Sequence, residues 1–279
     1  MTRKPRMLPG LFLLGTTLSS GCRPHRESNP ELPDVGHPAQ PPPDQEGSAS
    51  PALADQADSS GGPPRRRPGA YANIDRADDR VVGPPDPIAD CEDQLAQAGV
   101  TFKPASLPVH MDSSAKITCG APQVVTYLHG PGNITYEPWP VLTCEMALAL
   151  ASYERIVQEE ANRVFGSPVT RVEQIGTYSC RGIVRFKGII SEHSYANAID
   201  LTRFTLKNKK VVSVLSDFDM GDGAPARPGG DFLRGISQRG QDEDVFSNVL
   251  TAFWDEAHKN HFHLDLARYR VNGVRPPRR

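Results

Sequence analysis

The sequence predicts an α+β domain, a small antiparallel sheet packed with helices, over residues 88–272. Apolar residues recur at helical spacing in some segments and alternate with period two in others. The two kinds of segment follow one another in irregular order, which is typical of this class. The first third of the 279-residue chain has neither pattern, and residues 273–279 are expected to form a short tail.

A long helix is expected over residues 141–166, where apolar residues fall on one helical face. Pro140 precedes it, Thr143 is the candidate N-cap, and Gly166 marks its end. The less regular segment 170–182 is expected to enter a strand.

Residues 183–190 (IVRFKGII) have the composition of a strand. The apolar segments 197–206 and 210–218 flank the polar residues 207–209, which predicts a hairpin. Residues 242–258 predict a second core helix, because five apolar residues share one helical face. These residues are Val245, Phe246, Val249, Leu250 and Phe253.

The segment 261–269 (HFHLDLARY) alternates with period two, as expected for a strand with one face in the core. The apolar face carries Phe262, Leu264 and Leu266. The opposite face carries His261, His263 and Asp265. His258 lies just upstream, and packing alone does not explain three imidazoles so close together in the sequence.

Residues 1–22 have the layout of an export signal, with a basic start, an apolar stretch over 8–14 and small residues after it. The basic residues are Arg3, Lys4 and Arg6. A membrane-spanning helix needs roughly 20 apolar residues, so this stretch is too short. The sequence LSSGC resembles a bacterial lipobox, in which Cys22 is lipidated and becomes the first mature residue. The alternative is a plain secretory signal with an incidental cysteine.

Residues 23–87 contain 14 of the 27 prolines in the chain, together with many small polar residues. Such a segment has too little apolar surface to offset the entropy of ordering, so it is expected to be a disordered linker. Proline favours extended conformations, which suit a spacer. The formal charge of −2 gives no electrostatic reason to expect a nucleic-acid partner.

Four cysteines lie in the expected domain, and an exported protein is expected to join them in two disulfides. They are Cys91, Cys119, Cys144 and Cys180. All three pairings stay open. None of the four forms a C-x-x-C pair, which weighs against a cysteine metal site. Cys22 is left over, as a lipid-modified cysteine requires.

A metal site is expected from two segments that are far apart in the sequence. SEHSYANAID (191–200) supplies His193 and Asp200, and HKNHFHLD (258–265) supplies a histidine. Zinc accepts imidazole nitrogen and carboxylate oxygen, and a catalytic site keeps a fourth position open for water. Asp200 lies between two apolar residues, where a buried carboxylate needs a compensating cation or donors.

SEHSYANAID resembles the S-x-H-x-x-G-x-A-x-D signature of the zinc D-Ala-D-Ala carboxypeptidases, and HKNHFHLD resembles the closing H-x-H signature of their superfamily. Penicillin-insensitive murein endopeptidases and the zinc domain of hedgehog belong to the same superfamily. Together with TCEMALAL, GTYSCRG and FLR, these segments are similar to the bacterial extensin-like C-terminal domain family over about residues 88–270. The resemblance implies a hedgehog/D-Ala-D-Ala-peptidase-like zinc domain.

The resemblance also implies roles for particular residues. The implied zinc ligands are His193, Asp200 and His263. His258 and His261 are implied as the acid/base pair. Arg181 lies where relatives hold an arginine that grips a substrate carboxylate, and a structural ion pair is the alternative for this residue.

We therefore expect a zinc metallopeptidase that acts on stem or cross-link peptides of peptidoglycan, of the endopeptidase or D,D-carboxypeptidase type. We expect it in the periplasm or at the cell surface, anchored to the membrane through lipidated Cys22. The alternative is a non-catalytic zinc-containing module that binds peptidoglycan, in which His261 or His258 closes the fourth position of the metal.

Overall fold

We describe a computed structural model of the chain, which covers residues 84–114, 116–183 and 189–276. The predicted export signal with Cys22 and the linker as far as residue 83 lie outside the described residues. So do residues 184–188, the centre of the strand expected at 183–190. The flanking residues Gly182 and Ile190 form an isolated antiparallel bridge.

The described residues contain two sheets, and most strand pairs are antiparallel. The smaller sheet has the order β1-β2-β4: β1 (Thr101–Asp112), β2 (Ile117–His129) and β4 (Val141–Thr143). The larger sheet has the order β3-β5-β6-β9-β8: β3 (Thr135–Glu137), β5 (Val169–Gly176), β6 (Ala198–Leu206), β9 (Phe262–Asp265) and β8 (Asn248–Leu250). The pair β3–β5 is parallel. The expected α+β class is confirmed.

Strand β6 is the centre of the larger sheet. One edge of β6 pairs with β5. The other edge is shared, because residues 198–201 pair with β9 and residues 203–205 pair with β7 (Val211–Ser213). The predicted hairpin is therefore confirmed as β6–β7, but its second arm is short. Residues after β7 form the helix α3 (Val214–Asp217) instead.

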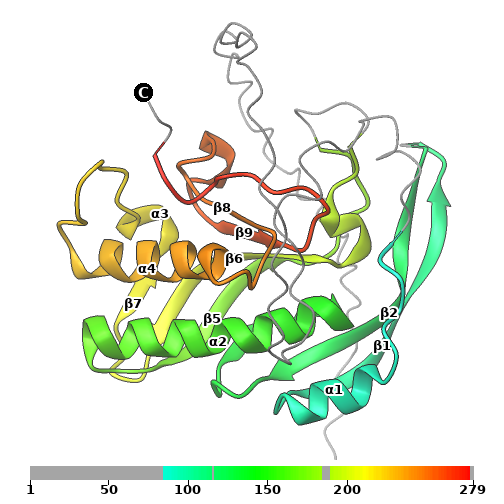
Figure 1. The fold of residues 1–279 in the computed structure, drawn as a ribbon, viewed down its shortest axis with the longest axis horizontal. Coiled ribbons are helices and arrows are strands. Elements are labelled where there is room, and N and C mark those ends of the chain that lie inside the picture. Colours follow the sequence, from blue (N-terminus) through cyan, green and yellow to red (C-terminus); the bar gives the residue numbers. More distant parts are fainter. Residues whose placement is uncertain (1–83, 115, 184–188, 277–279) are drawn as a thin grey trace, which may run out of the picture. The chain divides into compact units, whose positions relative to one another are not determined.

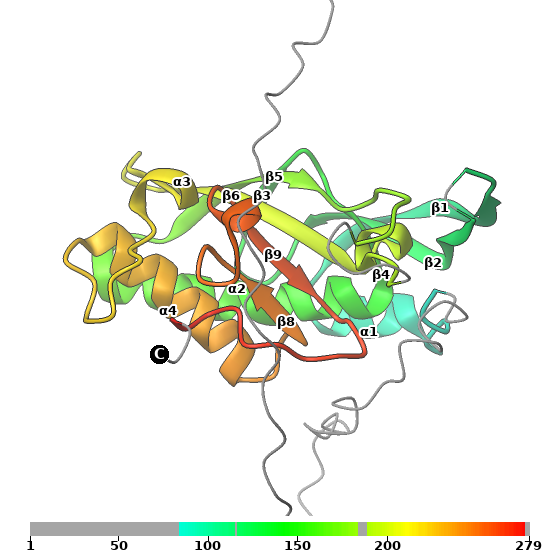
Figure 2. The ribbon, with the colours of Figure 1, turned by 90° about the horizontal axis from the view of Figure 1, so that it is seen from above.

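Helices α2 (Cys144–Phe165) and α4 (Pro228–Asp242) lie side by side on one face of the larger sheet (Figures 1 and 2). The N-cap predicted at Thr143 and the end predicted at Gly166 are confirmed, but Val141–Thr143, which were expected to be part of this helix, form strand β4. Thr143 Oγ1 accepts a hydrogen bond from Met146 N, and Gly166 ends the helix in a left-handed conformation with φ of 59°. In the described part of the chain, no helix has both the length and the apolarity needed to cross a bilayer.

The prediction of a core helix over residues 242–258 is wrong. Val249 and Leu250 belong to strand β8, which pairs with β9. The apolar spacing fitted a helix, but β9 offers the backbone of this segment inter-strand hydrogen bonds that a sequence pattern does not show.

Helix α4 lies immediately before the segment where the helix was expected. It starts Pro-Gly-Gly, which has low intrinsic helix propensity. Burial of Phe232, Leu233 and Ile236 against the core stabilises it. Gly240 allows a close approach to α2, because a Cβ there would lie 3.0 Å from the Tyr153 ring.

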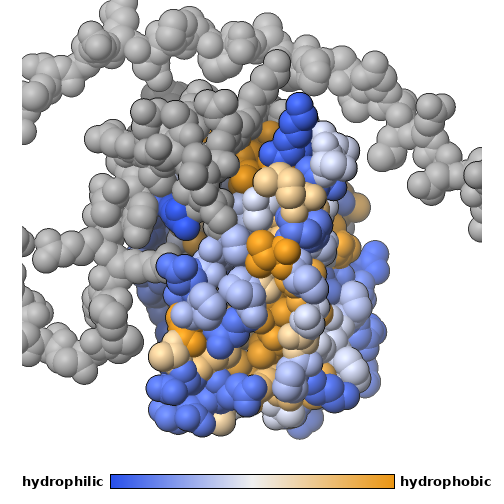
Figure 3. All heavy atoms as spheres, turned by 90° about the vertical axis from the view of Figure 1, so that its right-hand side faces the viewer, coloured by the Kyte–Doolittle hydropathy of each residue, from blue (hydrophilic) through white to orange (hydrophobic). Residues whose placement is uncertain are grey.

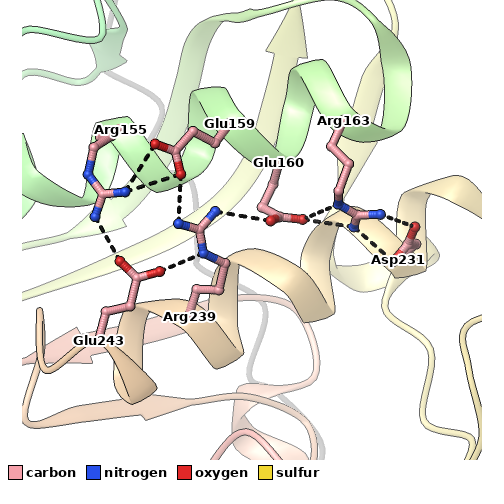
Figure 4. Close-up of polar contacts among 7 residues, drawn as sticks. All are labelled: Arg155, Glu159, Glu160, Arg163, Asp231, Arg239 and Glu243. Carbon is pink, nitrogen blue, oxygen red and sulfur yellow. Dashed lines mark hydrogen bonds and ion pairs between the residues drawn. The ribbon is translucent and has the colours of Figure 1, made fainter.

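An ion-pair network joins the outer surfaces of α2 and α4 (Figure 4). Arg239 on α4 is its centre, with contacts of 2.6 Å to Glu159, 3.1 Å to Glu160 and 2.6 Å to Glu243. Arg155, Arg163 and Asp231 extend the network at both ends. Exposed pairs contribute little singly, so the network mainly fixes the register of two helices that buried apolar residues already hold together.

The β1–β2 hairpin had not been expected from the sequence, because prolines and bulges interrupt its alternation. It forms the side of the domain shown in Figure 3, where hydrophobic side chains lie among hydrophilic ones. Strand β1 is at the sheet edge and contains Pro104 and Pro108. Proline has no N–H to donate, so this edge is a poor template for a further strand.

The two expected disulfides are present, and the structure decides their pairing. Cys91 pairs with Cys144 and joins α1 (Cys91–Gln97) to the start of α2. Cys119 pairs with Cys180 and joins β2 to the segment that follows β5. Disulfides are typical of proteins that fold in an oxidising compartment.

Residues 269–275 form a C-terminal strap that contacts α4 and the segment around β8. Val274 is fully buried in the main core. Thr251 Oγ1 donates a 2.6 Å hydrogen bond to the Gly273 carbonyl, and Gln241 Nε2 donates to the Val271 carbonyl at 2.7 Å. The folded unit therefore includes residues 273–275, which were expected to belong to the C-terminal tail.

Glu154, in the middle of α2, is a fully buried carboxyl. Its two oxygens accept hydrogen bonds from the Tyr127 hydroxyl at 2.8 Å and from the Gly132 amide at 2.7 Å. Burial raises the pKa of Glu154 from 4.5 to about 7, although these hydrogen bonds oppose the shift. The folded state therefore favours the protonated carboxyl.

This shift predicts how stability depends on pH. A pKa raised by folding stabilises the protein below the unfolded value, and the contribution is lost as pH rises through the folded value. We expect Glu154 to lower the free energy of unfolding by about 3 kcal/mol between pH 4.5 and 8. Urea unfolding with intact disulfides should show that Glu154→Gln removes this drop. Glu92→Gln, at an exposed carboxyl of α1, should retain it. An unchanged drop in Glu154→Gln would contradict the assignment.

Candidate metal centre

Asp200 and His263 face each other as direct partners across the β6–β9 pair. Their neighbours Ile199, Phe262 and Leu264 are fully buried in the main core. Because side chains alternate along a strand, Asp200 and His263 point to the opposite face of the sheet, away from α2 and α4. The sheet therefore brings together a carboxylate and an imidazole that are 63 residues apart.

His193 comes from the short 3-10 helix η2 (Glu192–Tyr195), immediately before β6. The chain then turns through Ala196, whose φ of 54° lies in the left-handed region, and enters the strand. His193 Nε2 lies 3.2 Å from Asp200 Oδ2 and 3.1 Å from His263 Nδ1. His263 Nδ1 lies 3.0 Å from Asp200 Oδ1.

The three side chains have the geometry of a metal site. One candidate ligand atom from each lies within 4.8 Å of the other two. Two nitrogens and one oxygen form a donor set that suits Zn²⁺. His193 is 2% exposed and the Asp200 side chain 14%, so a carboxylate and two imidazoles are withdrawn from water at one point. The residues present fit the expected metal.

The electrostatics of the cluster are strongly coupled. Burial opposes ionisation of Asp200, but hydrogen bonds from His193 and His263 hold its pKa well below the usual range. Burial also opposes the charge of His263, but Asp200 and Asp265 raise the pKa of His263 to about 10. Without a metal, a proton on His263 compensates the buried carboxylates, and this is the charge that a divalent cation would replace.

Asp265 is the outer partner of His263. Its Oδ2 accepts a 2.9 Å hydrogen bond from His263 Nε2, which leaves Nδ1 directed toward Asp200. Metal-binding histidines characteristically donate their second N–H to a carboxylate in this way. Asn248 Nδ2 donates to Asp265 Oδ1 at 2.8 Å, and Asn248 Oδ1 accepts from Val271 N of the C-terminal strap. The sequence placed Asp265 on the same face as His263, but its role was not recognised there.

Two polar residues hold the loop that carries His193. Ser194 Oγ bonds both the backbone N–H and the carbonyl of Arg181, at 3.0 and 2.8 Å. Asn197 Nδ2 donates to Glu192 Oε2 at 2.7 Å, and Asn197 Oδ1 accepts from Thr143 Oγ1. Burial and the Asp265 carboxylate raise the pKa of Glu192 to about 7. The loop is therefore tied to the segment after β5 and to the start of α2.

His258 and His261 lie next to the three candidate ligands. His258 ends the 3-10 helix η3 (Glu256–His258), and its ring centroid lies 5.2 Å from that of His261 and 6.0 Å from that of His263. His261 Nε2 lies 3.8 Å from Asp200 Oδ1. Burial lowers the pKa of both rings, opposed by Asp255 at His258 and by Asp200 at His261. The shift favours the neutral form of both rings.

Arg181 is exposed, and its backbone is held beside His193 through Ser194. Within the described residues, its guanidinium has neither an ion pair nor a hydrogen bond. The structural ion pair that was the alternative for Arg181 is therefore not seen among them.

Residues 89–275 match the protein family described as extensin-like protein C-terminus. This match covers most of the chain and the whole candidate site. The chain belongs to the extensin-like C-terminal family. Neither a search of curated proteins nor a search of solved structures finds a match.

In this extensin-like protein, Ala196 makes the turn between His193 and β6, and its φ of 54° lies in the left-handed region. Glycine adopts positive φ without strain, whereas alanine in the left-handed region costs roughly 1 kcal/mol or more. The turn between His193 and β6 thus keeps the conformation that favours glycine although its residue is alanine.

The bond between His263 and Asp265 predicts a defined effect on metal affinity. Asp265→Asn should weaken zinc binding by about 10- to 100-fold, because the amide cannot hold the imidazole as the carboxylate does. Competition with a chromophoric chelator at pH 7.5 measures this. His110→Ala, an exposed histidine on β1, should bind zinc like the wild type. If Asp265→Asn and the wild type bind zinc with equal affinity, Asp265 has no role in metal binding.

Proposed function

We propose that this protein is a zinc-dependent peptidase that acts on peptidoglycan peptides at the cell envelope. The observation that carries the proposal is the convergence of His193, Asp200 and His263, with two further histidines beside them. Three ligands of this kind, held on a rigid strand pair and one adjoining turn, are typical of catalytic rather than fully closed zinc sites.

The proposed chemistry is hydrolysis of an amide bond. A zinc ion bound by the three residues would polarise the peptide carbonyl and lower the pKa of a bound water. Burial lowers the pKa of His258 and of His261 and so favours neutral rings, and a neutral ring can take a proton from water and return it to the leaving amine. Asp265 keeps His263 oriented throughout.

Two features bordering the centre support a peptide substrate. Gly176 on β5 pairs with Asp200, and a Cβ at this glycine would lie 3.9 Å from Asp200 Oδ2. Because Gly176 has no side chain, there is room for a substrate beside Asp200 on the β5 side of β6. Arg181 follows on the same segment with an exposed guanidinium, which suits a planar, bidentate contact with a substrate carboxylate.

The proposed location rests on the N-terminal sequence and the disulfides. The export signal and the lipobox support a membrane anchor at Cys22, followed by the proline-rich linker. A flexible chain of that length spans roughly 45 Å on average, so the domain would reach the wall from the membrane. The two disulfides are consistent with such an oxidising environment.

A non-catalytic module that binds peptidoglycan is the second candidate. One observation favours it: His261 Nε2 lies only 3.8 Å from Asp200 Oδ1, close enough for His261 to close the fourth metal position. Such a module would bind zinc and the wall but release no products.

Digestion of purified peptidoglycan separates the two candidates. We expect the full chain loaded with zinc to release muropeptides, detected by chromatography and mass spectrometry. His193→Ala should release none, because it loses a ligand, and His110→Ala should match the wild type. A wild type that binds zinc and sediments with peptidoglycan but yields no products would overturn the peptidase in favour of the binding module.

Arg181 predicts a preference for substrates with a free carboxylate. Charge-assisted hydrogen bonds contribute about 1.5–3 kcal/mol, so Arg181→Gln should lower kcat/KM by about 10- to 100-fold on a stem peptide with a free C-terminus. On the same peptide with an amidated C-terminus, kcat/KM of Arg181→Gln should equal that of the wild type, because this peptide has no C-terminal carboxylate. Arg203→Gln, an exposed arginine of β6 paired with Glu173, is the control. An equal loss on both peptides would argue against carboxylate recognition.

A further inference from the structure

Asp255 holds the histidine that faces the candidate metal centre. It is the N-cap of η3, and its Oδ1 accepts from the His258 backbone N–H at 3.3 Å. The same oxygen lies 2.6 Å from His258 Nδ1. The side chains of Asp255 and His258 are 8% and 16% exposed, so the contact is largely shielded from water. One carboxylate thus contacts both the backbone and the ring of His258.

The loop that carries Asp255 is fixed before and after this residue. Phe253 packs edge-on against Phe218, with ring centroids 5.3 Å apart, and the Arg234 guanidinium lies over the Phe253 ring, 5.3 Å from its centroid. Thr251 Oγ1 accepts from Phe253 N and donates to the Gly273 carbonyl of the C-terminal strap. After Asp255, the His258 ring contacts Asp255 and also packs near the rings of His261 and His263. The geometry of Asp255 is therefore set by packing and not by the histidine alone.

A neutral imidazole carries one proton, so the hydrogen bond at one nitrogen decides the role of the other. We propose that Asp255 is a positioning residue that keeps the His258 proton on Nδ1 and presents the bare Nε2 as the atom that exchanges protons during hydrolysis. This inference rests on the proposed peptidase function. It distinguishes His258 from His261, whose Nδ1 bonds the uncharged side chain of the neighbouring Asn260 at 2.8 Å. His258 is therefore the principal acid/base group and His261 the secondary one.

A purely structural role of Asp255 as a helix cap is the competing explanation. Asparagine caps helices about as well as aspartate, so Asp255→Asn preserves the cap but removes the carboxylate that fixes the tautomer. The matched control is Glu256→Gln. Its carboxylate is adjacent in sequence, exposed and paired with Lys259.

Two measurements test the proposal. Long-range ¹H–¹⁵N NMR correlations of His258 in the full chain, with and without zinc, should show the Nδ1–H tautomer in the wild type and a loss of that preference in Asp255→Asn. Peptidoglycan hydrolysis by Asp255→Asn should fall by about 10²- to 10⁴-fold, with the zinc dissociation constant within about twofold of the wild type. The acid limb of its pH–rate profile should shift to lower pH, and Glu256→Gln should behave as wild type.

An Nε2–H tautomer at His258 in the wild type would overturn the proposal. The proposal would also be overturned if the wild type is active and Asp255→Asn has the same activity and the same His258 tautomer. Failure of the peptidase function itself gives a different result, namely no muropeptides from the wild type. In that case the NMR measurement still decides whether Asp255 fixes the tautomer of His258.

Discussion

The antiparallel pairing of β6 with β9 is the constraint on which the rest of the structure depends. It sets Asp200 directly opposite His263, and a shift of one residue would turn one of these side chains into the core. Buried apolar residues that alternate with them hold this register, so the packing of the sheet against α2 and α4 also fixes the site. Stability and site geometry therefore share the same contacts.

Around this pair, polar residues supply the positions that the strands alone do not specify. Asp265 orients His263, and Asn248 orients Asp265. Ser194 and Asn197 hold the turn that delivers His193. Each of these side chains is buried or largely buried and makes more than one hydrogen bond, which leaves few alternative arrangements for the three candidate ligands.

Features that depend on local chemistry were predictable from the sequence. Thr143 and Gly166 delimit α2 as expected. The two disulfides and the meeting of the candidate ligands were also expected, but from the predicted export and from the resemblance of two motifs rather than from local chemistry. Other features that depend on distant partners were not predictable. Val245, Phe246 and Val249 fit a helical face as well as a strand and turn, and pairing with β9 decides between them. The contacts of Asp255 and Asp265 depend on side-chain directions that spacing does not specify.

The C-terminal strap has a consequence for the order of events during biogenesis. Val271 N donates a hydrogen bond to Asn248, which in turn bonds the Asp265 partner of His263. The Gly273 carbonyl accepts a hydrogen bond from Thr251, in the loop that leads to Asp255. Val271 and Gly273 are among the last residues of the domain to emerge from a ribosome or a translocation pore. A nascent chain therefore cannot complete these contacts around the centre until the C-terminal residues of the domain are free to fold.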